Sequence, residues 1–295
     1  MEEGKSLINI GELSKPATVL IEKISEAVGG IFRPYQIRRV AKAEADAEEI
    51  KAVSKIEVTD LQRRAMRRFL EEEGKKQENI ESITSKALPN VDESSTPEKI
   101  ENDWLTNFFD KCRLISDEEM QNLWARVLAG EANKPGKFSK RTLSVLSSLD
   151  KSDATLFQRL CPFTWVVDDV LFPAIYEEDK TFYDDFGIMF SSIKHLTEIG
   201  LVSHTDSSSF ALKKFFSLNK LERNVDASYY DSRFSIKFRW AKNNEMNLGN
   251  VLFSKVGVDL AQLCDSQPVP RCKEFVIKKW KTFGLKVVAS NEEQL

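Results

Sequence analysis

The sequence lacks the patterns that usually identify an enzyme or a metalloprotein. It contains only two histidines and four cysteines, and no two cysteines form a Cys-x-x-Cys pair, so no zinc site is expected. A phosphate-binding Gly-x-x-x-x-Gly-Lys loop, a Gly-x-Ser-x-Gly elbow and a His-Glu-x-x-His motif are also missing. We therefore expect no enzymatic activity, no cofactor and no bound metal, and we expect the cysteines to be free thiols.

A long apolar run and a large net charge are missing as well. No segment approaches the roughly 20 apolar residues that a membrane-spanning helix needs. The first residues, MEEGKSLINI, lack the basic start and cleavage site of a signal peptide, which predicts a cytoplasmic location. With 43 basic and 46 acidic residues, the net charge is only -3, so the chain as a whole is not built to coat nucleic acid.

The clearest positive feature is an apolar segment from Ala17 to Phe32, which lies between Pro16 and Pro34. Its apolar residues recur at helical spacing and predict an amphipathic helix that must bury one face. The partner could be this protein's own core, another subunit or a membrane. A single such helix, about 24 Å long, is shorter than a bilayer core of about 30 Å and could only lie in the interface. The candidate membrane-active residues are Leu20, Ile21, Ile24, Val28, Ile31 and Phe32.

Residues 36–95 are predicted to form a long helical arm followed by a linker that begins near Pro89. The arm has a thin apolar side, and its charges are segregated along the chain. A basic block is followed at once by the acidic run from Glu71 to Glu73. Either these charges pair within one solvated helix, or the blocks of neighbouring copies pair in an oligomer. The basic block consists of Arg63, Arg64, Arg67 and Arg68.

The rest of the chain changes from helical to mixed patterns. Residues 96–162 carry helix caps and large apolar side chains such as Trp104 and Trp124, which predict a helical bundle. Strand-like runs follow a helix that ends at Gly200, and this order resembles a winged-helix domain over 163–295. The pairs Asp168-Asp169 and Asp184-Asp185 fit helix capping or solvation better than metal binding, and His195 fits a structural role. The expected strands are 201–203, 209–218, 233–240, 250–255 and 285–288.

The winged-helix pattern keeps nucleic acid open as an alternative partner. Positive charge is interleaved with phenylalanines in the strand-rich part, but acidic residues such as Glu222 and Asp226 lie among the same residues. Recognition of a protein by the same surface is at least as well supported. The basic residues are Lys213, Lys214, Lys220, Arg223, Lys237 and Arg239.

Three stretches resemble a bacterial family known only as a domain of unknown function. They are LSKPATVLIEKISEAVGGIFRPYQIRRVAKAEA, DWLTNFFDKCRLISDEEMQNLWARVLAGE and PGKFSKRTLSVLSSLD. The resemblance covers the first half of the chain well and the second half weakly. It implies a protein associated with phage or prophage, in a setting of defence against phage, and it carries over no catalytic residue.

These observations predict a mainly α protein with a C-terminal α+β part. The predicted parts are an amphipathic N-terminal segment (1–35), the arm and linker (36–95), a helical bundle (96–162) and a winged-helix-like domain (163–295). The predicted function is that of an anti-phage defence effector that senses a phage protein, forms a homo-oligomer and perturbs the inner membrane through the N-terminal helix. The alternative is a nucleic-acid-binding winged-helix regulator or adaptor.

Reversing Arg63, Arg64, Arg67 and Arg68 to Glu tests whether the basic block pairs between copies. If it does, the variant should stay folded but fail to assemble, because like charges would then face each other. Sedimentation velocity measures the outcome, and an unchanged sedimentation coefficient would contradict pairing between copies.

Overall fold

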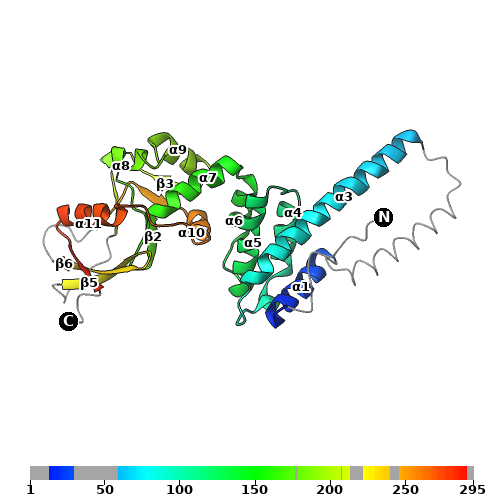
Figure 1. The fold of residues 1–295 in the computed structure, drawn as a ribbon, viewed down its shortest axis with the longest axis horizontal. Helices are drawn as coiled ribbons and strands as arrows, with labels where there is room; N and C mark the ends of the chain where they lie inside the picture. The colour runs from blue at the N-terminus through cyan, green and yellow to red at the C-terminus, as the bar shows by residue number, and fades with distance from the viewer. Residues whose placement is uncertain are drawn as a thin grey trace. The chain divides into compact units, whose positions relative to one another are not determined.

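The computed structural model describes residues 13–29, 59–176, 179–206, 208–212, 222–239 and 246–290. The chain divides into two compact units, Met1–Ser147 and Ser148–Leu295, and each is described by itself. The described elements of the first unit are helical, whereas the second unit combines helices with antiparallel strands (Figure 1). The prediction of a mainly α chain with a C-terminal α+β part is confirmed.

The first unit contains α-helices joined by short turns of 3-10 helix. The α-helices are α1 (Lys15–Val28), α3 (Asp60–Ala87), α4 (Asn102–Cys112), α5 (Glu118–Asn133) and α6 (Lys140–Ser148). The 3-10 turns are η2 (Leu88–Asn90) and η3 (Pro97–Lys99).

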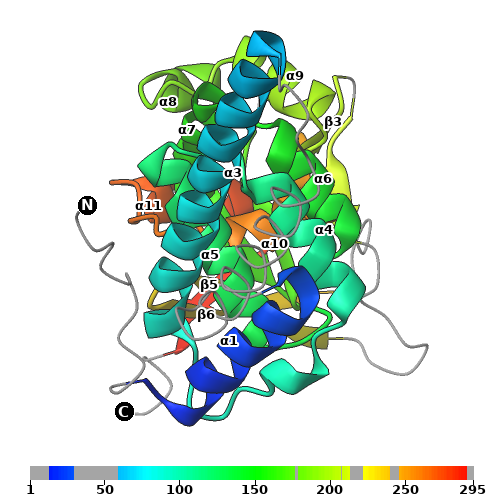
Figure 2. The same ribbon diagram turned by 90° about the vertical axis from the view of Figure 1, so that its right-hand side faces the viewer.

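The ends of α1 follow from its flanking residues. The Ser14 hydroxyl accepts a hydrogen bond from the Ala17 N–H at 3.3 Å, and Pro16 lies in the first turn, where a helix needs no N–H donor. Gly29 ends the helix at a φ of 78°, a backbone conformation that residues other than glycine rarely adopt. The predicted helix is confirmed over 15–28, and α1 lies against α4 (Figure 2).

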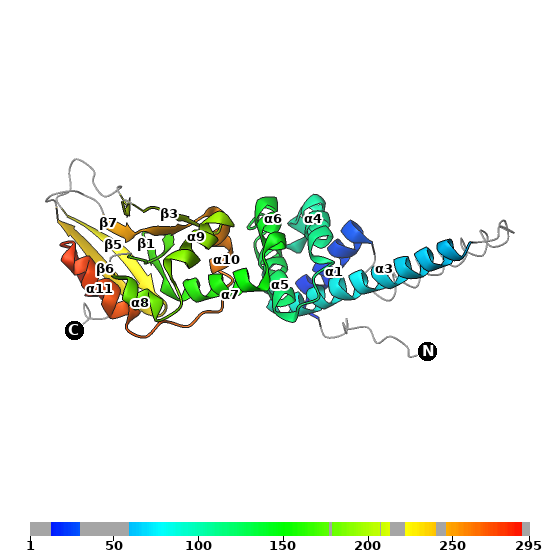
Figure 3. The same cartoon turned by 90° about the horizontal axis from the view of Figure 1, so that it is seen from above.

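Helix α3 is packed at one end and exposed at the other. It begins at Thr59, whose hydroxyl oxygen accepts from the Gln62 N–H while Gln62 Oε1 accepts from the Thr59 N–H. Its C-terminal part packs against α5 and buries Ile83 and Ala87. Its N-terminal part extends past α5 (Figure 3) and is exposed from Asp60 to Lys75. The predicted arm is thus confirmed from Asp60 onward, and residues 36–58 lie outside the described residues.

Three large aromatic side chains fill the centre of the first unit. Phe108 stacks on Trp104 with ring centroids 5.2 Å apart and meets the edge of Trp124 at 5.1 Å. Trp104 Nε1 donates a hydrogen bond to the Phe138 carbonyl at 2.7 Å, so this indole satisfies its polar atom while it is buried. These contacts form the apolar core of the helical first unit.

The stretch predicted to be a linker is attached to the end of α5 instead. The Asn133 side chain accepts from the Asp92 N–H at 2.9 Å and donates to the Asn90 carbonyl at 3.0 Å. Val91 is buried beside it. Because glycine commonly ends a helix, the sequence predicts an end at Gly130. Helix α5 instead continues to Asn133, since packing of this last turn outweighs the roughly 1 kcal/mol cost of a helical glycine.

A buried carboxylate organises the loop that follows α5. Glu131 Oε1 accepts from the Gly136 N–H at 2.6 Å, and Oε2 accepts from the Phe138 N–H at 2.9 Å. Burial raises the pKa of Glu131, and these hydrogen bonds to the ionised form only partly oppose the rise. The loop that carries the Trp104 acceptor therefore depends on one acidic side chain.

The second unit alternates short helices with strands. The helical segments are α7 (Lys151–Leu160), η4 (Cys161–Phe163), α8 (Lys180–Asp184), α9 (Phe190–Glu198), α10 (Lys255–Ala261) and α11 (Cys272–Thr282). The strands are β1 (Thr164–Val167), β2 (Val170–Pro173), β3 (Val202–His204), β4 (Phe210–Leu212), β5 (Glu222–Tyr229), β6 (Ser232–Arg239), β7 (Met246–Gly249), β8 (Val251–Phe253) and β9 (Lys286–Ala289). Helix α7, grouped with the bundle in the sequence analysis, contacts α9 and η4 of this unit.

Five strands form an antiparallel sheet in the order β2-β1-β5-β6-β9. One face is buried, and α11 packs on it, with Trp280 against Trp165 at a centroid distance of 4.7 Å. Trp280 Nε1 donates to the Tyr176 hydroxyl at 2.7 Å. The opposite face carries polar residues, because Asn224, Asp226 and Ser228 alternate with the buried residues of β5.

A smaller strand pair follows α9. The chain turns at Gly200 and enters β3, which pairs with β8 so that Val202 lies opposite Phe253. Gly257 at the start of α10 lets the backbones approach closely, because a Cβ there would lie 2.0 Å from the Leu201 carbonyl oxygen. Strands β3, β6, β8 and β9 match predicted ones, and β4 matches over 210–212. Strands β1, β2, β5 and β7 were not predicted.

Replacing Glu131 with Ala should destabilise the first unit by about 2–4 kcal/mol, because two backbone N–H groups near the core lose their acceptor. Urea unfolding followed by tryptophan fluorescence measures this change. Glu118→Ala, at an exposed position in the first turn of the same helix, is the control and should cost no more than about 1 kcal/mol. Equal effects of the two substitutions would contradict the role assigned to Glu131.

Candidate functional site

The apolar face of α1 is buried in the protein's own core. Leu20 and Ile24 are fully buried, and Ile21 is 4% exposed. The face packs on α4 and η3, while the charged residues Glu22 and Glu26 point to solvent. Of the three partners that the sequence left open, this structure therefore shows the protein's own core. Val28 is half-buried, and Ile31 and Phe32 lie outside the described residues.

Apolar packing holds α1 in this position. The hydrogen bond from Thr106 Oγ1 to the Ala27 carbonyl is long, at 3.4 Å, and it lies at the exposed end of the contact. Each fully buried Leu or Ile contributes about 1.5–3 kcal/mol. The Ser25 hydroxyl is buried and has no hydrogen-bond partner among the described residues, which weakens the packing. Packing of its apolar side chains therefore provides most of the interaction that holds α1 on the first unit.

The basic block of α3 lies in solvent and pairs within its own helix. Arg64 contacts Asp60 at 2.6 Å, Arg67 contacts Glu71 at 3.0 Å and Arg68 contacts Glu72 at 3.4 Å. Arg63 is exposed as well. Pairing within one helix is one of the two interpretations that the sequence allowed. Exposed ion pairs of this spacing stabilise a helix by only about 0.3–0.5 kcal/mol each. Such weak pairs leave the arginines available to exchange partners.

The other side of the same helix segment carries large exposed apolar side chains. Leu61 is 68% exposed, Met66 65%, Phe69 60% and Leu70 65%. The sequence predicts a thin apolar side for the whole arm. Met66 and Leu70 were not singled out from the sequence, and with Phe69 they lie at three- and four-residue spacing, whereas Leu61 lies at the edge of this apolar side. We name these four residues the α3 stripe.

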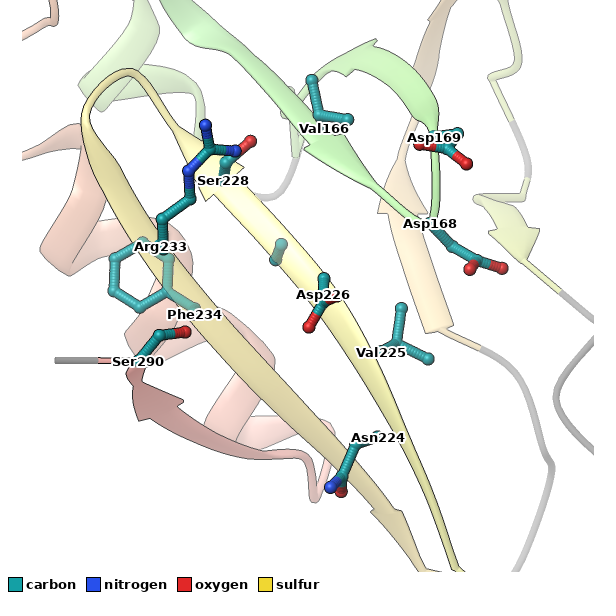
Figure 4. Close-up of a pocket in the computed structure, with 11 residues that line it drawn as sticks. Val166, Asp168, Asp169, Asn224, Val225, Asp226, Ser228, Arg233, Phe234 and Ser290 are labelled. Carbon is teal, nitrogen blue, oxygen red and sulfur yellow. The ribbon is translucent and has the colours of Figure 1, made fainter. Parts of the chain in front are cut away.

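The polar face of the five-stranded sheet contains an open hollow of about 550 Å³ (Figure 4). Asp226 and Ser228 of β5, Arg233 of β6 and the Asp168-Asp169 turn line it. Both turn residues have positive φ, 49° and 64°, as a two-residue hairpin turn requires, and the Asp168 N–H donates to the Asp226 carbonyl at 3.1 Å. With three carboxylates and one guanidinium among these residues, the hollow is acidic.

Sequence reasoning missed this hollow because β5 was not recognised as a strand. Its signal is the alternation of Asn224, Asp226 and Ser228 with apolar Val225 and Ala227. Asp184, of the other acidic pair, ends α8 at the surface. No group of His, Cys, Asp or Glu within the described ranges could hold a metal ion.

The histidine near the apolar stripe of α9 joins two helices. His195 Nε2 lies 2.6 Å from Asp153 Oδ1, and Asp153 Oδ2 accepts from the Asp150 N–H at the start of α7. Partial burial acts to raise the pKa of Asp153, but the bonds from His195 and Asp150 outweigh it and lower that pKa. The carboxylate thus caps α7 and binds α9, which is a structural role for both residues.

The remaining predicted groups are placed as follows. All four cysteines are free thiols, and Cys112, Cys161 and Cys272 are buried. Of the predicted basic residues, Lys237 is opposite Asn224 on the sheet. Lys213, Lys214 and Lys220 lie outside the described residues, as do the side chains of Arg223 and Arg239. No helix within the described ranges has the length and apolar character needed to cross a membrane.

The fold is that of a two-unit protein, with a helical first unit and a second unit of helices on antiparallel sheets. A family described as protein of unknown function (DUF2806) matches residues 63–276, more than half of the chain, so the protein belongs to this family. The match runs through the strand-rich part, which corrects the expectation that the resemblance is weak in the second half, and it begins after α1. Neither the curated proteins nor the solved structures contain a match to the chain.

Replacing Asp153 with Asn should lower the stability of the second unit by about 1.5–3 kcal/mol at neutral pH, since charge-assisted hydrogen bonds at α7 and α9 are lost. Because the pKa of Asp153 is lowered in the folded state, its contribution is present above the unfolded pKa of about 4 and disappears as the pH falls through the folded value. Urea unfolding at a series of pH values measures the difference from wild type. Asp185→Asn is the control, because Asp185 is exposed in the same unit and its replacement should cost under about 1 kcal/mol.

Proposed function

We propose that this protein is a bacterial anti-phage defence effector that senses a phage protein, self-associates and perturbs the inner membrane through α1. The observation that carries the proposal is that the apolar face of an amphipathic helix is buried by apolar packing in this structure. Leu20, Ile21 and Ile24 are hidden against α4 and η3, so the resting protein presents no membrane-active face there. The setting of defence against phage rests on what the sequence resemblance implies, since the matching family is described only as a protein of unknown function.

The geometry of α1 sets how it would act on a bilayer. With 14 residues it is about 21 Å long, which is less than the hydrocarbon thickness of about 30 Å. Once released it would lie in the interface with Glu22 and Glu26 toward water. Several copies would be needed to disrupt the bilayer, which is why self-association belongs to the proposal.

The release of α1 requires a driving force that a protein partner can supply. Undocking exposes three large aliphatic side chains at a cost of about 1.5–3 kcal/mol each, and a nanomolar contact supplies about 12 kcal/mol. The acidic hollow beside Asp168, Asp169 and Asp226 is the surface that we assign to this contact. Its charge favours a partner segment that carries Lys or Arg.

A second candidate function is a nucleic-acid-binding winged-helix regulator or adaptor. The observation that favours it is the order helix α9, turn, β3 paired with β8, which resembles the helix and wing of that domain type. In that case α1 is a permanent part of the core. The exposed residues of α9 include Lys194 but also Glu198, which gives the helix little attraction for phosphates.

A reversible covalent lock on α1 tests the proposal. Leu20→Ala should loosen α1 by about 2–5 kcal/mol and increase dye leakage from phosphatidylethanolamine/phosphatidylglycerol vesicles. Adding Ala27→Cys and Thr106→Cys, at the two residues joined by the 3.4 Å hydrogen bond from Thr106 Oγ1 to the Ala27 carbonyl oxygen, should return leakage to the wild-type level when a disulfide between them is closed. Reduction of that disulfide should restore leakage.

Leu128→Ala is the matched control, because Leu128 is equally buried in the same unit but belongs to α5. Leakage from Leu128→Ala that matches Leu20→Ala would mean that general unfolding, not α1, perturbs the vesicles. Absence of leakage from every loosened variant, together with salt-sensitive DNA binding, would favour the regulator instead.

A further inference from the structure

The exposed part of α3 continues the face that this helix uses inside its own unit. Phe69, Ile83 and Ala87 lie within one side of the helix at 3.6 residues per turn, and the last two are buried against the body of the unit. Beyond the packed part lies the α3 stripe, which covers about half of the helix circumference around Phe69 and whose four side chains are each at least 60% exposed. A contiguous apolar stripe on an exposed helix is typical of a protein-binding surface.

We propose that the α3 stripe packs against the α3 stripe of a second copy of this chain, with the two helices antiparallel. This contact supplies the self-association step of the proposed function. It is tested without membranes, so a failure of vesicle leakage would leave it standing.

Charge order along the helix determines the antiparallel direction. The basic block from Arg63 to Arg68 precedes the acidic run from Glu71 to Glu73. Antiparallel helices bring the basic block of one copy beside the acidic run of the other, whereas parallel helices place like charges together. The weak pairs within each helix, such as Arg68 with Glu72 at 3.4 Å, can exchange for pairs between copies.

The length of the exposed segment determines the register. Only Asp60 to Lys75 is free of the body, so two such segments overlap fully over about four turns. Full antiparallel overlap places Met66 of one copy opposite Phe69 of the other, and Ala65 opposite Leu70. At each end of this seam, Arg63 of one copy then lies near Glu73 of the other, because Glu73 follows Phe69 by one turn on the apolar side. Apolar side chains therefore meet in the middle of the overlap and opposite charges at its ends.

The size of this contact predicts a weak dimer. Four helical turns from each copy give an interface at or below the small end of the range for specific complexes. Association should therefore depend on protein concentration, which keeps the protein monomeric when it is dilute. Any event that gathers copies would shift the equilibrium by mass action.

Sedimentation velocity of the full chain over a concentration series tests the proposal. Wild type should form a dimer, and Met66→Gln with Phe69→Gln should raise the dimer dissociation constant about tenfold or more. Because both side chains are exposed, the fold should be unaffected. The matched control is Leu114→Gln, since Leu114 is 68% exposed in the same unit but lies outside α3.

A charge exchange tests the direction and the register. Arg63→Glu and Glu73→Arg should each weaken the dimer, and the double variant should recover it, because the pair is restored in reversed polarity. Arg64→Glu changes the charge equally on the side away from the stripe and should have a smaller effect.

Three results would overturn the proposal. One is a protein that stays monomeric up to on the order of 100 µM. Another is a dimer that Met66→Gln with Phe69→Gln leaves unchanged. The third is protection of Met66 from oxidation in the monomer, which would show that another segment of the same chain covers the stripe.

Discussion

The packing of α1 on α4 is the contact on which the functional interpretation of this protein depends. It converts a segment with the sequence pattern of a surface-active helix into part of a core. The contact is almost wholly apolar. The free energy that holds α1 on the rest of the first unit therefore comes from three or four side chains. A helix held in this way can be displaced as a unit without breaking a network of hydrogen bonds.

Sequence reasoning located the helices where local signals and burial agree. The amphipathic pattern of Ala17 to Phe32 forms a helix over Lys15–Val28, and the predicted core residues Trp104 and Trp124 both pack on Phe108. It failed where distant residues decide the structure. Gly130 reads as a helix end, but the hydrogen bonds of Glu131 and Asn133 are made to residues that the local pattern does not specify. Strand β5 carries charged residues that only its position in a sheet explains.

The same limit applies to the candidate sites. The sequence predicted the α1 residues and the basic block of α3 as functional, and both are recognisable by periodicity alone. The hollow on the sheet was not predictable, because it joins the Asp168-Asp169 turn to β5 and β6, which begin more than 50 residues further along the chain. The α3 stripe was predictable from the sequence only in part, since the spacing of apolar residues does not distinguish a face that is exposed from one that is buried.

The position of Asp153 has a mechanical consequence. Its carboxylate caps the first turn of α7 with one oxygen and contacts His195 of α9 with the other. That first turn begins at Lys151, directly after the point at which the first compact unit ends. A displacement of α9 would therefore stretch or break the His195–Asp153 contact, and the carboxylate that caps the helix at the start of the second unit would lose its partner. The carboxylate thus acts as a tether between the interior of that unit and the chain that leads into it.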